Sequence, residues 1–220
     1  MANKPLNINK KKLLLVEGST DGHFCGILLN KLGIKDVQIV GSLDNLGGID
    51  IVSVGGISKF KTRLENLQLV SGFRNVEKIG IIADSDNNLA EDTFNEIKIK
   101  VLKPCGFNLP NKLNELSTGT IKTIIHIIDC NEKKGCLESL CLQAIKHDYA
   151  IPVIENFEKT IKTFPSDKEP ECLYKSKVQV YMASMKALAH YPALGAKKGY
   201  FDLDNSVFDD LKSFLKLFAK

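Results

Sequence analysis

The chain has 220 residues, of which 44% are hydrophobic and 25% are charged, and its formal net charge is +4. This balance is ordinary for a globular protein, and so mild a basicity permits nucleic-acid binding without arguing for it. No apolar run reaches the roughly 18 residues of a membrane span, and no signal-peptide core follows the N-terminal lysines. We therefore expect a cytoplasmic protein with no membrane segment.

The six cysteines form no CxxC pair, and no histidine lies at a zinc-like spacing from two of them. We expect reduced, mostly buried cysteines rather than a disulfide framework. The four histidines show no ligand spacing, and we assign them no role.

Strand and helix patterns alternate over the first 147 residues. The segment KLLLVEG begins the series with a continuous apolar run, which is typical of a strand buried on both faces. Ser19 or Thr20 can cap the helix that follows, and Gly33 can end it. Further strands are predicted at 36–40, 78–84 and 120–131, and further helices at 57–70, 89–102 and 135–147. Between the second strand and the second helix, a glycine-punctuated segment has another apolar core at 49–54. The glycine pairs 47–48 and 55–56 predict turns, because they lack the lysine and spacing of a phosphate loop.

This alternation predicts an α/β fold with a mainly parallel, Rossmann-like sheet flanked by helices over residues 10–147. The remaining residues, 148–220, are expected to form a helical C-terminal extension packed on the same core. We predict a helix and a loop within 149–171, one long helix over 172–191, and a closing amphipathic helix over 205–218 that Asn205 or Ser206 caps.

Two of the predicted strands end in acids. The first gives Glu17, and the strand KIGIIADSD gives Asp84 and Asp86. Ligands bind beyond the carboxyl ends of the strands in open parallel sheets, so these carboxylates are expected to converge if the strands are neighbours. Like charges at short range resist joint ionisation, and a hard divalent cation relieves them. Gly18 allows a sharp turn after Glu17 and leaves room for a phosphate.

The pair VEGSTD and IIADSD resembles the TOPRIM domain, in which a glutamate ends one buried strand and Asp-x-Asp ends a later one. The resemblance covers roughly residues 10–145, and Glu17, Asp84 and Asp86 match its motif positions. A closer resemblance is to small stand-alone TOPRIM proteins related to the OLD family of nucleases. Asn88 replaces the third acid that topoisomerases and primases often carry, which argues against those two groups and is compatible with the OLD-like group.

The OLD-like resemblance implies further site residues. Asp21 corresponds to the second acid of the first motif, although OLD enzymes more often have glutamate there. Glu138 in GCLES matches an acid at a helix start, and Lys177 in KSKVQVYMAS matches a lysine near the metals. Gly18, Lys175 and Lys177 are the implied nucleic-acid contacts.

By this resemblance the site binds one or two Mg²⁺ or Mn²⁺ ions and hydrolyses a phosphodiester of DNA or RNA. The implied metal ligands are Glu17, Asp21, Asp84, Asp86 and Glu138. Glu17 also bridges the metals or acts as general base, and Lys177 neutralises charge on the phosphate. We expect hydrolysis by water rather than topoisomerase chemistry, because these residues leave no room for a separate gate domain with a tyrosine nucleophile.

Other interpretations stay open. Asp84 and Asp86 are also compatible with loop acids or with a cap at 86–88 for the next helix, and Asp21 and Glu138 with acids that favour a helix N-terminus. An alternative function is a non-catalytic or partner-dependent module that binds nucleic acid or a nucleotide, for example in phage defence. The chain has no GxxxxGK[ST] motif, so the ATPase of OLD enzymes would come from a separate subunit. A homodimer is compatible with the sequence.

Overall fold

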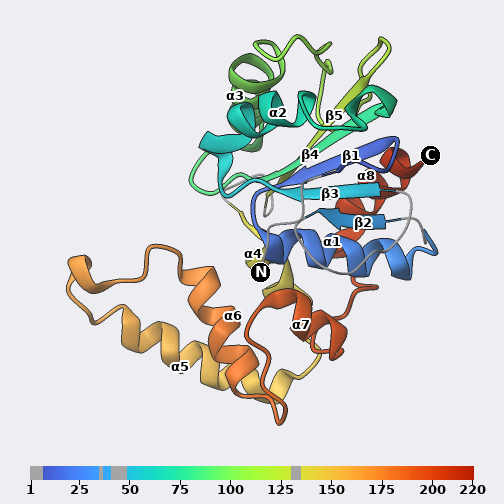
Figure 1. Cartoon of the computed structure of the whole chain (residues 1–220). Helices are drawn as coiled ribbons and strands as arrows, with labels where there is room; N and C mark the ends of the chain where they lie inside the picture. Colours follow the sequence, from blue (N-terminus) through green and yellow to red (C-terminus); the bar gives the residue numbers. More distant parts are fainter. Residues whose placement is uncertain (1–6, 35–36, 41–48, 130–134) are drawn as a thin grey trace, which may run out of the picture.

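The structure is a computed structural model that describes residues 7–34, 37–40, 49–129 and 135–220. Five parallel strands form one sheet in the order β2-β3-β1-β4-β5 (Figure 1). The strands are β1 Lys12–Val16, β2 Val37–Val40, β3 Ile49–Ser53, β4 Lys78–Asp84 and β5 Lys122–Ile128. The predicted α/β fold with a parallel sheet and C-terminal helices is confirmed, and it is consistent with a Rossmann-like TOPRIM fold.

Helices cover both faces of the sheet. The helices are α1 Ser19–Lys31, α2 Phe60–Gln68, α3 Ala90–Ile97, α4 Leu137–Gln143, α5 Ile151–Ile161, α6 Leu173–Ala183, α7 Pro192–Lys197 and α8 Asp209–Ala219. Helices α2 and α3 pack on one face and α1 and α8 on the other. The central strands are apolar on both sides because each side is buried under a helical layer.

The side chains of β5 show how the two layers share the sheet. Ile125 and Ile127 belong to the core under α2 and α3, while Ile124 and Ile128 belong to the core under α1 and α8. The second core also includes buried side chains of α4, α6 and α7, which extends it beyond the sheet. The division of the chain at residue 147 stays a prediction.

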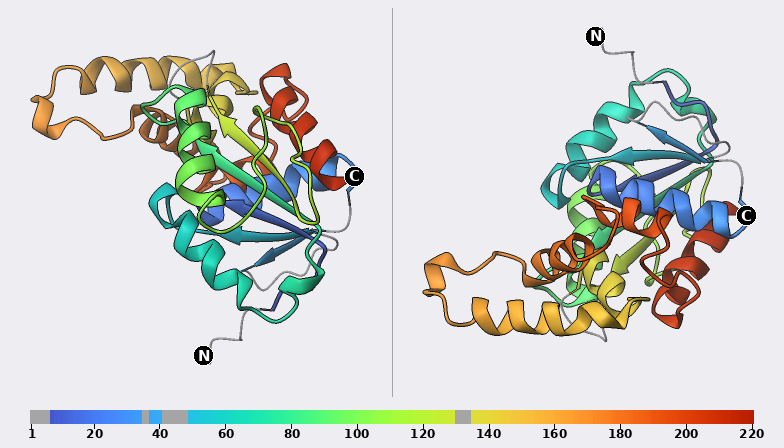
Figure 2. Two further views of the ribbon diagram at one scale, coloured as in Figure 1. Left: turned by 90° about the horizontal axis from the view of Figure 1, so that it is seen from above. Right: turned by 90° about the horizontal axis from the view of Figure 1, so that it is seen from below.

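Helices α5 and α6 form a hairpin that projects from the body of the molecule (Figures 1 and 2). The prediction of one long helix over 172–191 is wrong, because α6 ends at Ala183. Ser184 is the C-cap residue, and its amide and its hydroxyl both donate to the Val180 carbonyl. Among the described residues, no helix combines the length and the apolar character that a membrane crossing needs.

Two of the glycine predictions can be compared with the backbone. Gly33 follows α1 with φ +75°, and the Ile34 amide bonds back to the Leu29 carbonyl, which confirms a glycine helix end. Gly55 and Gly56 also have positive φ, as expected for a turn. The predicted turn at 47–48 lies outside the described residues.

Candidate functional site

Glu17 and Asp84 meet at the carboxyl edge of two neighbouring strands. Strands β1 and β4 are paired in parallel, with Val16 opposite Ile82, so the residues that follow them emerge at the same edge. The Asp84 amide donates a hydrogen bond of 2.8 Å to Glu17 Oε1. A direct hydrogen bond thus connects Glu17, which follows β1, with Asp84 at the end of β4.

Asp21 joins this edge from the first turn of α1. Its Oδ2 accepts a 2.7 Å hydrogen bond from the amide of Gly18, which is the N-cap residue. The predicted cap by Ser19 or Thr20 is wrong, because the helix begins at Ser19 and has no side-chain cap there. A Cβ atom on Gly18 would lie 3.0 Å from Asp21 Oδ2, so the glycine allows this carboxylate to approach the backbone. A nucleic-acid contact at Gly18 stays a prediction.

The segment after β4 is tied to the start of α4. The Ser85 hydroxyl donates to the Gly135 carbonyl at 3.2 Å and accepts from the Gly135 amide at 2.7 Å. The Asp86 amide bonds the same carbonyl at 3.0 Å, and the Leu137 amide donates to Asp84 Oδ1 at 3.2 Å. These bonds bring the first turn of α4, which carries Glu138, to the edge where Asp84 lies.

The exposed Asp86 has the left-handed φ of 48°, which aspartate tolerates better than most residues. The alternative that residues 86–88 cap the next helix is wrong, because the N-cap of α3 is Leu89 and no side chain caps it. The conformation of Asp86 therefore belongs to the turn that β4 makes toward Gly135.

The carboxylates at this edge repel one another. Burial raises the pKa of Asp84, which is 7% exposed, well above its ordinary value. The charges that add to this effect are those of Asp21, Glu17, Glu138 and Asp86. Burial also raises the pKa of Glu17 to about 7 and that of Asp21 to about 6, although each carboxylate accepts a backbone hydrogen bond that opposes the rise. The four other predicted acids are thus all within electrostatic range of Asp84.

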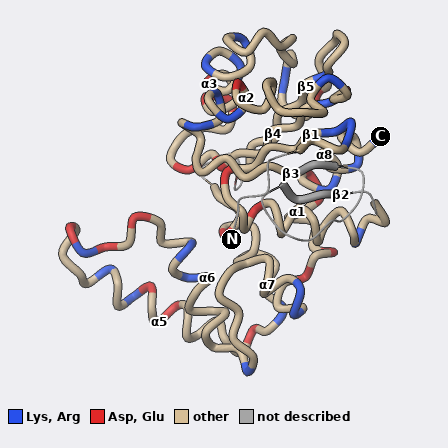
Figure 3. The backbone as a smooth tube through the Cα atoms, viewed as in Figure 1, with Lys and Arg blue, Asp and Glu red and all other residues tan. Residues whose placement is uncertain are grey.

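The two predicted lysines of α6 have different surroundings. Burial lowers the pKa of Lys175, but the charges of Glu138 and Asp84 outweigh it, and the net shift is upward. Lys177 instead forms an ion pair of 2.6 Å with Glu158 of α5, inside a hairpin that carries charges of both signs (Figure 3). The structure therefore brings Lys175, and not Lys177, to the carboxylates. A catalytic role for Lys177 stays a prediction.

The donor set suits a hard cation, because its side-chain ligands are all carboxylate oxygens. Within the described ranges, no three His, Cys, Asp or Glu side chains are arranged to share one metal ion as they stand. Metal binding would therefore require side-chain rotation at this edge, and the ligand roles of the five acids stay predictions.

Sequence reasoning missed Ser85, which is fully buried between the two acids of the ADSD motif. Its partner, Gly135, is 50 residues away along the chain, and no periodicity or composition signal connects the two. The sequence indicated the acids of this edge but not the hydroxyl that fixes the turn between them.

The parallel sheet and its acidic carboxyl edge define the class as an α/β protein consistent with a Rossmann-like TOPRIM fold. The chain belongs to the family described as "Protein of unknown function (DUF3226)", whose model matches residues 11–220. No curated protein matches the chain.

Two solved structures are similar. A hypothetical protein from Pyrococcus horikoshii OT3 has a TM-score of 0.50 at 17% identity, with 96% of this chain and 94% of that chain covered. The C-terminal region of the OLD protein of Xanthomonas campestris pv. campestris has a TM-score of 0.42 at 14% identity, with the same coverage. At such identities a likeness concerns the fold alone.

Proposed function

We propose that this protein hydrolyses a phosphodiester bond of nucleic acid with the help of a divalent metal ion held at the carboxyl edge of β1 and β4. One observation carries the proposal: carboxylates from β1, α1, β4 and α4 gather at this edge, and burial and mutual repulsion raise the pKa values of Glu17, Asp21 and Asp84. Strongly perturbed acids at a sheet edge are more typical of a functional site than of a structural ion pair.

A divalent cation would remove the cost of this arrangement at neutral pH. Without it, the edge reduces its repulsion by holding protons on carboxyl groups that are ionised in water. Oxygen ligands of this kind favour Mg²⁺ or Mn²⁺. The ion would supply Lewis-acid polarisation of a phosphate and stabilise the charge that develops on it.

The protein's own residues take separate roles in this proposal. Asp84, Asp86 and Glu138 would hold the ion, and Asp21 would support it from α1. Glu17, whose pKa of about 7 lies near the working pH, would accept the proton of the attacking water. Its carboxylate is already oriented by the Asp84 amide. Lys175 would neutralise negative charge on the bound phosphate.

The proposed substrates are DNA and RNA, and a separate ATPase subunit or a second copy of the chain is a compatible partner. The alternative is a partner-dependent module that binds nucleic acid or a nucleotide without cleaving it alone. The two functions differ in what the purified chain does by itself.

Cleavage by the purified chain tests the proposal. Supercoiled plasmid and structured RNA would be incubated with Mg²⁺, Mn²⁺ or EDTA, beside Glu17→Gln and Asp84→Asn. Asp92→Asn, at an exposed acid in the first turn of α3, is the matched control. We expect metal-dependent cleavage that falls by about 1000-fold or more in both site variants and is unchanged in the control. Cleavage that survives both substitutions would contradict the proposal, and folded protein that binds Mn²⁺ without cleaving would favour the partner-dependent function.

A further inference from the structure

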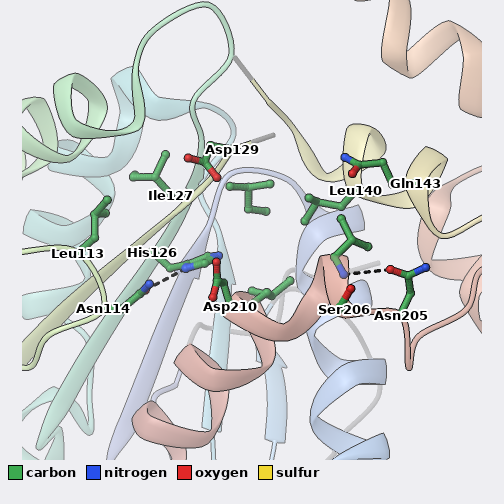
Figure 4. Close-up of a pocket in the computed structure, with 13 residues that line it drawn as sticks. Leu113, Asn114, His126, Ile127, Asp129, Leu140, Gln143, Asn205, Ser206 and Asp210 are labelled. Atoms are coloured by element: carbon green, nitrogen blue, oxygen red, sulfur yellow. Dashed lines mark hydrogen bonds between the residues drawn. The ribbon is translucent and has the colours of Figure 1, made fainter. Parts of the chain in front are cut away.

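A pocket opens beside the C-terminal half of β5, between α4 and the start of α8 (Figure 4). Its volume is about 560 Å³, within the usual range of small-molecule sites. The described lining contains none of the five carboxylates predicted at the acidic edge. The pocket adjoins the acidic edge, because Ile128 in its lining is paired with Asp84, but nothing in the proposed hydrolysis uses it.

His126 is the unusual residue of this pocket. It lies on β5 between Ile124 and Ile128, on the face that packs under α8, and only 5% of it is exposed. Its ring centroid is 5.2 Å from that of Phe214. A polar ring at an otherwise apolar position costs stability unless both of its nitrogens find partners.

The bonding of His126 fixes which nitrogen carries the proton. Nδ1 lies 2.9 Å from Asn114 Oδ1, and an amide oxygen can only accept, so Nδ1 donates. Burial lowers the pKa of the ring to about 4, so it is neutral at physiological pH. Nε2 is then a hydrogen-bond acceptor, and among the described residues only Nδ1 has a hydrogen-bond partner. Nε2 is not one of the fully buried side-chain atoms without a partner, and His126 lines the pocket, so a ligand there can reach it. An unpartnered acceptor at a pocket indicates a ligand that donates.

A second acceptor lines the same pocket. Asp210, in the first turn of α8, is exposed and forms no ion pair with any residue that the structure describes. Neither lysine nor arginine occurs among the described lining residues. Leu140 and Leu211 supply apolar surface on the walls. A further carboxylate of the lining, Asp129, already has a partner of its own. The pocket therefore combines His126 Nε2 and the Asp210 carboxylate with apolar side chains, and its described lining supplies no cation.

We propose that this pocket binds a small molecule through a guanidine-type edge, a planar group with adjacent N–H donors. The Asp210 carboxylate would accept two parallel N–H bonds from that edge. His126 Nε2 would accept a further N–H, and the leucines would contact the planar face. A guanine base and an alkylguanidinium both present this edge. The inference does not depend on the hydrolytic function.

Calorimetric titration of the full chain with guanosine and, separately, with agmatine tests the proposal and distinguishes the two sources. Inosine is the control for guanosine, because it lacks the exocyclic amino group and so the pair of adjacent donors. We expect saturable binding of guanosine or of agmatine, and weaker binding of inosine than of guanosine if the base is the ligand. No saturable binding of either probe at millimolar concentration would overturn the proposal.

Asp210→Asn and Asp209→Asn form a matched pair of variants in one helical turn. Asp209 pairs with Lys212 at 3.0 Å and does not line the pocket, so its substitution changes the same charge at the same helix start. We expect Asp210→Asn to weaken binding by about tenfold or more, the loss of one charged hydrogen-bonding partner. Equal effects of the two substitutions would overturn the assignment of Asp210.

The ¹⁵N resonance of His126 Nε2 gives a readout that needs no substitution at the buried ring. An acceptor nitrogen shifts when it receives a hydrogen bond, and the three other histidines serve as internal controls. We expect the ligand to shift the Nε2 signal of His126 and to leave the other histidines unchanged. Saturation of the pocket without that shift would overturn the role of His126.

Discussion

Glu17 and Glu158 are the same type of residue with opposite electrostatic surroundings. At the sheet edge, burial and neighbouring acids raise the pKa of Glu17 to about 7. In the α5–α6 hairpin, hydrogen bonds from Lys177 and Lys162 lower the pKa of Glu158 to about 2. The hairpin supplies its carboxylate with cations, whereas the edge surrounds its carboxylates mainly with other carboxylates.

The comparison shows where the fold uses charge to stabilise itself and where it does not. Ion pairs such as Lys177–Glu158 stabilise a local structure modestly. Uncompensated acids at the edge destabilise the metal-free protein, a cost that natural proteins accept mainly at functional sites. The predictions below test whether the two regions differ in this way.

The largest expected effect separates the two lysines of α6. Lys175→Met should lower the rate of nucleic-acid cleavage by about 100-fold, because it removes the cation that lies near Glu138 and Asp84. Lys177→Met should change the rate by less than about threefold, since its charge serves Glu158. Single-turnover rates at saturating Mg²⁺ measure both, and a larger loss in Lys177→Met would favour the predicted catalytic role of that lysine instead.

Ser85→Ala should destabilise the protein by about 1–3 kcal/mol, because it leaves the buried amide of Gly135 without its hydrogen-bond acceptor. The Gly135 carbonyl keeps its bond from the Asp86 amide. Urea denaturation measures this loss, with the exposed Ser213→Ala as control. A loss below about 0.5 kcal/mol would mean that the hydroxyl does not hold the acidic edge together.

Glu17→Gln should stabilise the metal-free protein at pH 8. The folded-state pKa of Glu17 is raised. Its contribution to the stability of the folded protein is therefore present below about pH 4.5 and is lost as the pH rises through about 7. The neutral glutamine avoids that loss, and we expect a gain of about 1–2 kcal/mol at pH 8 that shrinks by pH 5. Urea denaturation in EDTA measures it; a variant less stable than the wild type at pH 8 would contradict the account of this edge.

Glu158→Gln should have the opposite sign and a smaller size. The folded-state pKa of Glu158 is lowered. Its contribution to the stability of the folded protein is therefore present above about pH 4.5 and is lost as the pH falls through about 2. At pH 7 we expect a loss of about 0.5–1 kcal/mol that decreases in high salt, as for a partly exposed ion pair. A gain in stability, as expected for Glu17→Gln, would remove the contrast between the two regions.

The sheet and its acidic edge could be predicted because their signals are local. Continuous apolar runs mark the buried strands β1, β4 and β5, and the acids follow two of these strands directly. The length of α6 could not be predicted, because the apolar pattern continues past Ala183 and no glycine or proline marks the end of the helix there.

The features that the sequence did not predict depend on contacts between segments that are distant along the chain. The sequence predicted both lysines of α6 but not which of them turns toward the acids, since that depends on how α6 packs on α4 and α5. The pocket at His126 was missed for the same reason: its partner Asn114 and the start of α8 are brought to β5 by the fold. The positions of these residues along the chain form no pattern that would indicate a shared site.

The central claim is that the acidic edge binds a divalent cation, and Mn²⁺ binding measures it most directly. Calorimetric titration and the paramagnetic resonance of free Mn²⁺ would be followed for the wild type, Asp84→Asn and Asp92→Asn at pH 8. The account predicts saturable binding that is lost in Asp84→Asn and retained in Asp92→Asn. No binding by the folded wild type, or binding that Asp84→Asn leaves unchanged, would contradict it.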